Sequence, residues 1–277
     1  MQQFFRVIFA TILLALLLPS TASATGPRVT TSLFTPHANQ IHAMDFPPFI
    51  STEVIDGGIV SELITTAMQR SGIDAEVTTH PVERMVYYYL LQAKALAEAG
   101  WHFNFTKQKQ EQLIFVPIVT LSENYFYYRP KHPQGLNISS SADLKGMRYG
   151  AHKGEEKSEF TKAGAEVYFG RTITMLKKLK LGELDFICAP PEAVDWLVER
   201  YMKEDKKEFV TMPDEVDSQV LYVVFNRQHP LAEEAANKFR KELSAMKKDG
   251  TMDKITSKYL GGGESGRLFL RRLESFK

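Results

Sequence analysis

Cysteine is almost absent from this chain, since Cys188 is the only one among 277 residues. No disulfide can form within the chain, so its stability must come from a hydrophobic core, for which the length is sufficient. Cys188 follows Phe186 and Ile187 in a short apolar run, which predicts a buried, unreactive thiol. A catalytic thiol would need a histidine partner, and none lies nearby in the sequence.

Excess charge of either sign is also missing. The formal net charge is +1, so neither a nucleic-acid partner nor a polycationic partner is indicated. The seven histidines show no H-x-x-x-H or H-E-x-x-H spacing, and neither a Walker loop nor a G-x-S-x-G elbow is present. The glycine-rich residues 261–266 follow a predicted helix rather than a strand, which argues against phosphate binding. We therefore expect no metal and no cofactor.

A hydrophobic run long enough to predict a membrane span is missing as well. The apolar run over residues 7–18 follows Arg6, is broken by Pro19, and precedes a small-x-small motif at residues 22–24. This pattern predicts a cleaved secretory signal peptide over residues 1–24, with an uncleaved anchor as the alternative. We expect a periplasmic protein without stable membrane insertion after cleavage, and no cysteine lies there to carry a lipid.

The stretch over residues 44–63 organises the rest of the sequence. Pro47 and Pro48 cannot donate to a sheet ladder, so they end a strand and begin an extended loop. The loop places Phe46 and Phe49 at the carboxyl end of that strand, beside the start of a helix, where open α/β sheets bind ligands. The alternative is that both rings fill the hydrophobic core.

Hydrophobic periodicity predicts strands and helices that alternate along the chain, which indicates an α/β fold with mostly parallel sheets. Two β-prone segments, residues 123–128 and 219–225, bracket a compact α/β unit. We predict that the chain leaves a first lobe through one of them and returns through the other, so that both serve as hinges. The predicted first lobe comprises residues 25–127 and 222–277, and the inserted second lobe comprises residues 128–221.

Five motifs in order then resemble the extracellular solute-binding proteins of family 3, the amino-acid-type binding proteins of ABC importers. They are FPPF with DGG (46–63), PVER (81–84), ENYFYYRP with LKGMRYGAHKGE (123–155), LKLGELDF (179–186) and the C-terminal helix pair (229–260). The resemblance implies the two-lobe fold of type II periplasmic binding proteins, with two hinge strands. It also implies a monomer that binds a small-molecule solute in the cleft, closes, and contacts an ABC permease.

The same resemblance indicates which residues hold the solute. Family members commonly bind the ligand carboxylate with an arginine, and Lys109 occupies that position here. Lysine neutralises an anion but lacks the planar fork of arginine. Lys109 and Lys107 are alternatively solvated loop charges. Arg84 at the start of a helix is a second candidate, or else a surface ion pair with a neighbouring glutamate.

The second lobe departs from the family pattern too. Glu155 follows Gly154 where the family has Ser or Thr, so it competes with an anionic ligand group or caps the helix. Glu192 is nearest to the place of the aspartate that holds the ligand amino group, or else it interacts with a helix dipole. Trp101 ends a strand and either stacks on the ligand or packs in the core.

Because two of the three amino-acid anchors are altered and the cleft is aromatic, we hypothesise a solute other than a standard free α-amino acid. The predicted function is periplasmic binding of a small polar or amino-acid-like solute for an ABC importer, without enzymatic activity. A ligand sensor that acts through a partner protein is one alternative. A dehydratase or lyase is another, and it would need Glu98, Glu155 or Glu192 as an acid in the cleft.

Overall fold

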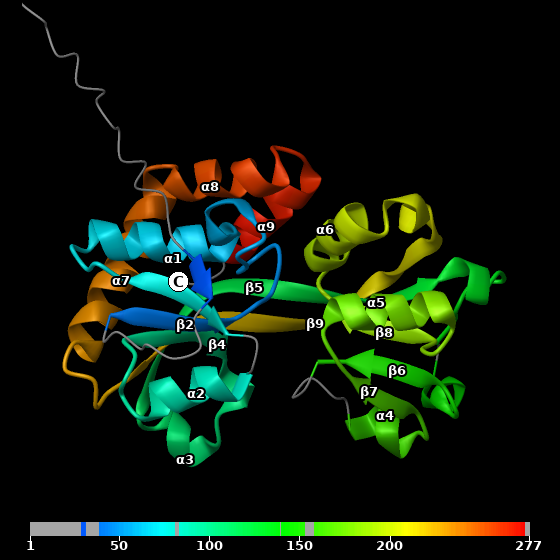
Figure 1. Cartoon of the computed structure of the whole chain (residues 1–277). Coiled ribbons are helices and arrows are strands. Elements are labelled where there is room, and N and C mark those ends of the chain that lie inside the picture. The colour runs from blue at the N-terminus through cyan, green and yellow to red at the C-terminus, as the bar shows by residue number, and fades with distance from the viewer. Residues whose placement is uncertain (1–28, 32–38, 81–82, 139, 153–157, 275–277) are drawn as a thin grey trace, which may run out of the picture.

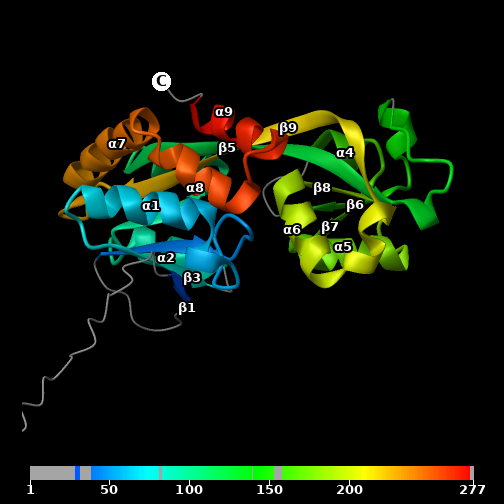
Figure 2. The same ribbon diagram turned by 90° about the horizontal axis from the view of Figure 1, so that it is seen from above.

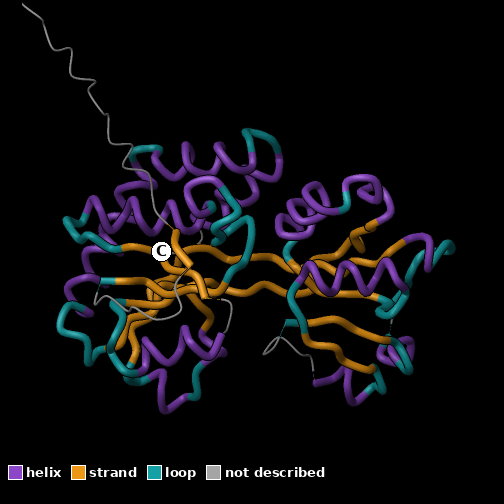
Figure 3. The backbone as a smooth tube through the Cα atoms, in the orientation of Figure 1, coloured by secondary structure: helices purple, strands orange, loops and turns teal. Residues whose placement is uncertain are grey.

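The computed structural model describes residues 29–31, 39–80, 83–138, 140–152 and 158–274 (Figure 1). The predicted signal peptide lies outside the described residues. Two groups of elements stand side by side, and strands run from one into the other (Figure 3). We call them the first lobe (β1–β4, α1–α3, α7–α9) and the second lobe (β6–β8, α4–α6), each completed by part of β5 and of β9. The predicted residue limits of the lobes remain a proposal.

The strands form one sheet in the order β1-β3-β2-β4-β9-β5-β8-β6-β7. Within each lobe the pairs β1–β3, β2–β3, β2–β4, β6–β7 and β6–β8 are parallel, as alternation of strands with helices predicts. The strands are β1 (Val29–Thr31), β2 (Gln40–Met44), β3 (Glu76–His80), β4 (Ala97–Trp101), β5 (Leu113–Tyr128), β6 (Arg148–Ala151), β7 (Glu166–Phe169), β8 (Phe186–Ala189) and β9 (Phe209–Asn226).

The strands β5 and β9 join the lobes. They have 16 and 18 residues and pair antiparallel with each other through both lobes. Only parts of them, residues 123–128 and 219–225, are predicted as the connecting strands from the sequence. Pro117 lies inside β5 because the register shifts between Pro117 and Val119, and such an irregularity tolerates a residue that cannot donate. From the sequence alone, Pro117 predicts the end of a strand, whereas β5 continues through it.

Helices cover both faces of each lobe (Figure 2). In the first lobe α1, α7, α8 and α9 lie on one face and α2 and α3 on the other; in the second lobe α5 and α6 lie opposite α4. The helices are α1 (Ile59–Arg70), α2 (Glu83–Leu91), α3 (Lys107–Gln110), α4 (Ser158–Lys162), α5 (Thr172–Leu181), α6 (Pro191–Tyr201), α7 (Ala232–Lys248), α8 (Thr251–Leu260) and α9 (Glu264–Glu274).

The largest hydrophobic cluster lies under α1 and α7 in the first lobe, and two smaller clusters lie on the two faces of the second-lobe sheet. Successive side chains of a strand point to opposite faces of the sheet. Ile187 and Ala189 of β8 pack with α5 and α6, whereas Phe186 and Cys188 pack with Phe160 of α4. Cys188 is buried, as predicted.

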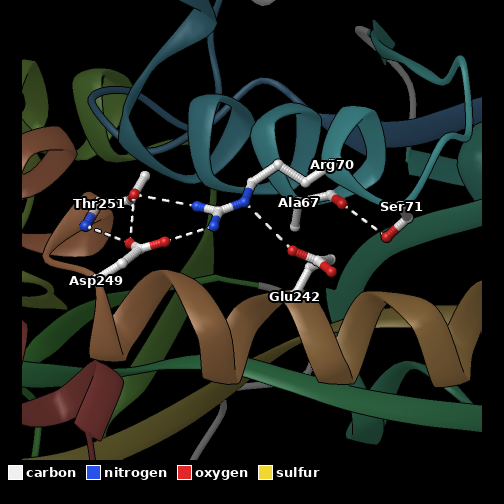
Figure 4. Close-up of polar contacts among 6 residues, drawn as sticks. All are labelled: Ala67, Arg70, Ser71, Glu242, Asp249 and Thr251. Atoms are coloured by element: carbon white, nitrogen blue, oxygen red, sulfur yellow. Dashed lines mark hydrogen bonds and ion pairs between the residues drawn. The ribbon is translucent and has the colours of Figure 1, made fainter.

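Polar contacts at the end of α1 tie it to the C-terminal helices (Figure 4). The guanidinium of Arg70 is 3.2 Å from a carboxylate oxygen of Glu242 in α7 and donates to Asp249 at the end of α7 and to Thr251, the first residue of α8. The Ser71 hydroxyl donates to the Ala67 carbonyl at 2.7 Å and so caps α1. Along the described residues, no helix is both long and apolar enough to cross a membrane.

Candidate functional site

The loop between β2 and α1 shapes one side of the interface between the lobes. The backbone N–H of Phe46 donates to Ile50 and the N–H of Ile50 donates back to Phe46, at 2.7 and 3.0 Å, which closes a tight loop around Pro47 and Pro48. The first amides of α1, those of Ile59 and Val60, donate to the carbonyls of Pro48 and Phe49. The loop therefore satisfies the N-terminus of α1, which leaves these amides unavailable to a ligand.

A glycine is required where this loop enters α1. Gly58 has φ +95°, and an added Cβ would lie 2.5 Å from the carbonyl oxygen of Pro48. A larger residue would push the loop away from the helix. The Asp-Gly-Gly turn that the sequence places here therefore holds the aromatic loop against α1.

A cavity of about 500 Å³ lies between the lobes, within the range of small-molecule sites. The first lobe lines it with residues 44–47, Glu53, Trp101, Phe103 and Asn104. The second lobe lines it with His152, residues 169–173, Lys177, Trp196, Leu197 and Tyr201. Residues 44–47, Trp101, His152 and residues 169–171 lie at or directly after the carboxyl ends of β2, β4, β6 and β7, where parallel sheets bind ligands.

Aromatic rings dominate the walls of the cavity. The Phe46 ring meets Trp101 edge to face with centroids 5.7 Å apart, and Trp101 stacks on Phe103 at 6.1 Å. From the second lobe, His152 meets Phe46 at 5.8 Å, and Trp196 packs against Tyr201. Rings on both walls favour a ligand with a flat or apolar body.

Two polar atoms in the first-lobe wall are buried without a hydrogen-bond partner among the described residues: Oδ1 of Asp45 and Nε1 of Trp101. A buried polar atom without a partner costs about 1–3 kcal/mol. Both residues line the cavity. Neither atom has surface exposed to the cavity, so both side chains must turn before a ligand can donate to Asp45 or accept from Trp101 and recover this free energy.

Positive charge comes from the second-lobe wall. Arg171 precedes α5 and Lys177 lies within it, and neither forms an ion pair among the described residues. His152 Nε2 lies 3.0 Å from Thr172 Oγ1. Burial lowers the pKa of His152 to about 4, so its imidazole is neutral at pH 7. The cations of this wall are therefore Arg171 and Lys177.

A contact at the rim joins the two lobes. The carboxylate of Glu53, in the loop after β2, accepts a hydrogen bond from the Tyr201 hydroxyl of α6. It also lies 3.3 Å from Nε of Arg200, whose guanidinium stacks over Trp196. The charge of Glu53 is thus matched by Arg200.

The predicted site residues are distributed unevenly. Phe46 and Trp101 line the cavity together. Phe49, by contrast, is fully buried in the first-lobe core, against Phe269 of α9. Arg84 lies in α2, but its side chain is outside what the structure describes, and Glu155 lies outside the described residues. The roles assigned to these residues stay predictions.

The two charged anchors that the resemblance favours do not line the cavity. Lys109 is exposed on α3, and Trp101, Phe103 and Asn104 before it line the cavity instead. Glu192 accepts a hydrogen bond at 2.7 Å from Arg272, which lies 80 residues away in α9. The guanidinium of Arg272 therefore neutralises the Glu192 carboxylate. No local sequence pattern predicts that α9 lies beside α6.

Sequence reasoning missed Asp45, Arg171 and Lys177. A usable signal existed for the first two. Asp45 directly follows a strand and precedes Phe46, and Arg171 lies between a predicted strand and a predicted helix, both at carboxyl ends of parallel strands. For Lys177, inside a helix, no such signal exists. The described residues contain no group of three His, Cys, Asp or Glu side chains placed to hold a metal ion.

Sequence comparison identifies no relative: no protein-family model matches, and no curated protein is significantly similar. Solved structures do match. A histidine kinase sensor domain with similarity to periplasmic binding proteins has a TM-score of 0.65 and 15% identity over 82% of this chain and 97% of that domain.

Two binding proteins are comparably similar. The arginine-, lysine-, histidine-binding protein ArtJ from Geobacillus stearothermophilus has a TM-score of 0.62 and 17% identity over 85% of this chain and 99% of its own. A histidine-bound substrate-binding protein of an ABC uptake transporter from Streptococcus pneumoniae has a TM-score of 0.61 and 15% identity over 80% and 92%. This chain has their two-lobe type II periplasmic binding protein fold, which confirms the predicted fold class and, at the level of the fold, the resemblance.

Proposed function

We propose that this chain is a periplasmic solute-binding protein whose lobes close on a small solute and deliver it to an ABC importer. The observation that carries the proposal is the interlobe cavity, with residues from both lobes and two buried polar atoms that lack partners among the described residues. A solute that contacts both walls binds the closed arrangement better than an open one. Binding therefore shifts the population towards closure.

The connections between the lobes support such a movement. Small rotations within β5 and β9, which run from one lobe into the other, would separate the cavity walls without breaking either core. The rim contact of Glu53 with Tyr201 forms only when the lobes are close. Similar structures that bind histidine and other amino acids support solute binding in general.

A sensor is the second candidate, because a sensor domain of a histidine kinase is among the similar structures. In that case closure would be detected by a partner protein rather than by a permease. Chemical cross-linking in native cells separates the two functions. Capture of a transporter subunit supports delivery, whereas capture of a kinase or another signalling protein supports sensing.

Mass spectrometry of protein purified from its native periplasm tests solute binding directly. We expect one small molecule to be released on denaturation, in near-equal molar amount with the protein. Small-angle scattering should show a smaller radius of gyration with the solute than without it. The variant Ile173→Arg places a large charged side chain in the cavity. It should retain no solute, which would show that the solute of the original protein is bound there. If no solute is retained and the scattering does not change, the proposed function is wrong.

A further inference from the structure

The charged side chains of the cavity that have no ion-pair partner among the described residues lie on opposite walls. We infer that the cavity binds a dipeptide-sized zwitterion, with its positive group against Asp45 of the first lobe and its anionic group against Arg171 and Lys177 of the second lobe. This inference rests on the proposed function and specifies the solute class of the same site.

On the first-lobe wall, Asp45 is the carboxylate without an answering charge. Oδ1 of Asp45 is buried and has no hydrogen-bond partner within the described part of the chain, whereas Glu53 is matched by Arg200. The neighbouring rings of Phe46 and Trp101 lower the local dielectric and present faces that attract cations. An ammonium group fits both features.

On the second-lobe wall the charges are positive. Arg171 and Lys177 line the cavity and have no ion-pair partner among the described residues. They lie at the start and in the second turn of α5, whose N-terminal dipole also favours an anion. Arginine and lysine together suit a carboxylate, the first by paired hydrogen bonds and the second as a point charge.

Between the charges, the cavity requires a hydrogen-bond acceptor and an apolar body. Nε1 of Trp101 is a buried donor that has no partner among the described residues, and an amide carbonyl would satisfy it once the ring turns towards the cavity. Rings from both lobes line the cavity, whose whole volume is about 500 Å³. A dipeptide with apolar side chains supplies an ammonium, an amide carbonyl, a carboxylate and an apolar body in one molecule.

This arrangement reverses the one that the family resemblance implies. There the cation belongs to the first lobe, at Lys109, and the acid to the second lobe, at Glu192. Here Lys109 is exposed on α3 and Glu192 is bound by Arg272. A zwitterion would therefore bind in the orientation opposite to the one that the family resemblance implies.

Calorimetry with four matched probes tests the inference. The probes are the dipeptide phenylalanyl-phenylalanine, its N-acetyl form, its C-terminal amide and the doubly capped neutral form. We expect the free dipeptide to bind at least tenfold more tightly than either singly capped form. Equal affinities for all four probes, or no binding of any, would overturn the inference.

Variants assign each end of the probe to a wall. Asp45→Asn should remove the preference for the free amine and leave the preference for the free carboxylate. The double variant Arg171→Gln with Lys177→Gln should do the opposite, and Lys109→Gln, outside the cavity, should change neither. A crossed result, in which Asp45→Asn removes the carboxylate preference, would overturn the orientation. Retention of some other solute from the periplasm would leave the proposed function standing while this inference failed.

Discussion

Two phenylalanines in one loop have different roles at the scale of single residues. The Phe49 side chain is fully buried, and its ring stacks on Phe269 with centroids 6.1 Å apart. Phe46, three residues earlier, is only partly buried and lines the cavity. The structure therefore places one ring in the core and the other in the candidate binding surface.

Alanine substitutions should separate these roles. Phe49→Ala should lower the free energy of unfolding by about 3–5 kcal/mol, because it leaves a cavity in a packed core. Phe46→Ala should cost less stability but weaken binding of the periplasmic solute. Urea unfolding followed by circular dichroism measures the first effect and calorimetry the second, with Phe46→Leu as the control that keeps most of the volume. Equal losses of stability in the two alanine variants would contradict the assignment.

The buried side chain of His42 makes the free energy of unfolding depend on pH. The side chain is 1% exposed, and Nδ1 contacts Nε2 of His80. Burial first, and the neighbouring histidine second, lower the pKa of His42 to about 3 in the folded protein. The unfolded chain takes up this proton near pH 6.5. The unfolded state therefore binds more protons below that pH, and stability falls as the pH drops from about 6.5 towards 3.

Between pH 7 and pH 5, this single proton should lower the free energy of unfolding by about 2 kcal/mol. Urea titrations at pH 7, 6 and 5 measure the slope, which should be shallower in His42→Gln than in the original chain. Substitution of the exposed His102 by glutamine is the control and should leave the slope unchanged. Parallel slopes for His42→Gln and the original protein would refute the prediction.

At the scale of elements, α9 contacts both lobes. Phe269 and Leu273 are buried in the first-lobe core, while Arg272 donates to Glu192 at the start of α6 in the second lobe. The side chains of this pair are 19% and 7% exposed. The helix therefore links the loop that carries Phe49 with the second lobe, a role that no local sequence pattern predicts.

A double-mutant cycle with Arg272→Gln and Glu192→Gln should reveal a coupling free energy of about 1–3 kcal/mol, between the values for exposed and for buried ion pairs. Chemical denaturation of the four proteins provides the measurement. The pair Glu234 and Lys238, exposed on α7, serves as the control cycle and should show no measurable coupling. Additive effects for Arg272 and Glu192 would mean that α9 does not hold the second lobe through this pair.

At the scale of the whole molecule, the rim contact bears on how long a solute stays bound. Glu53 of the first lobe accepts from Tyr201 and pairs with Arg200 of the second lobe. Opening of the cleft must break these contacts. Their loss should accelerate release more than it changes association.

We expect Glu53→Gln and Tyr201→Phe each to increase the dissociation rate of the solute about two- to tenfold, the range for a partly exposed polar contact. Stopped-flow fluorescence of the nearby tryptophans would follow release. Glu199→Gln is the matched control, because Glu199 pairs with Lys203 and Lys206 within the second lobe. An equal acceleration in that control would show that the rim contact is not specific.

The sequence by itself determined the kinds of elements and their order. Hydrophobic periodicity and helix-ending glycines are local signals, so the alternation of strands with helices could be predicted, as in β7 (Glu166–Phe169) and α5 (Thr172–Leu181). Proline and glycine likewise located the loop after β2 and its turn into α1. Phe46 and Trp101, which line the cavity, could be placed at strand ends because strand ends are recognisable in the sequence.

Only the tertiary structure decided which charges face the cavity. Lys109 and Glu192 are in the predicted segments, yet one is exposed and the other is bound to Arg272. Charge pairing depends on which side chains the packing of α9 and the two lobes brings within a few ångströms, and no local pattern encodes a contact across 80 residues. The same packing left Asp45, Arg171 and Lys177 facing the space between the lobes.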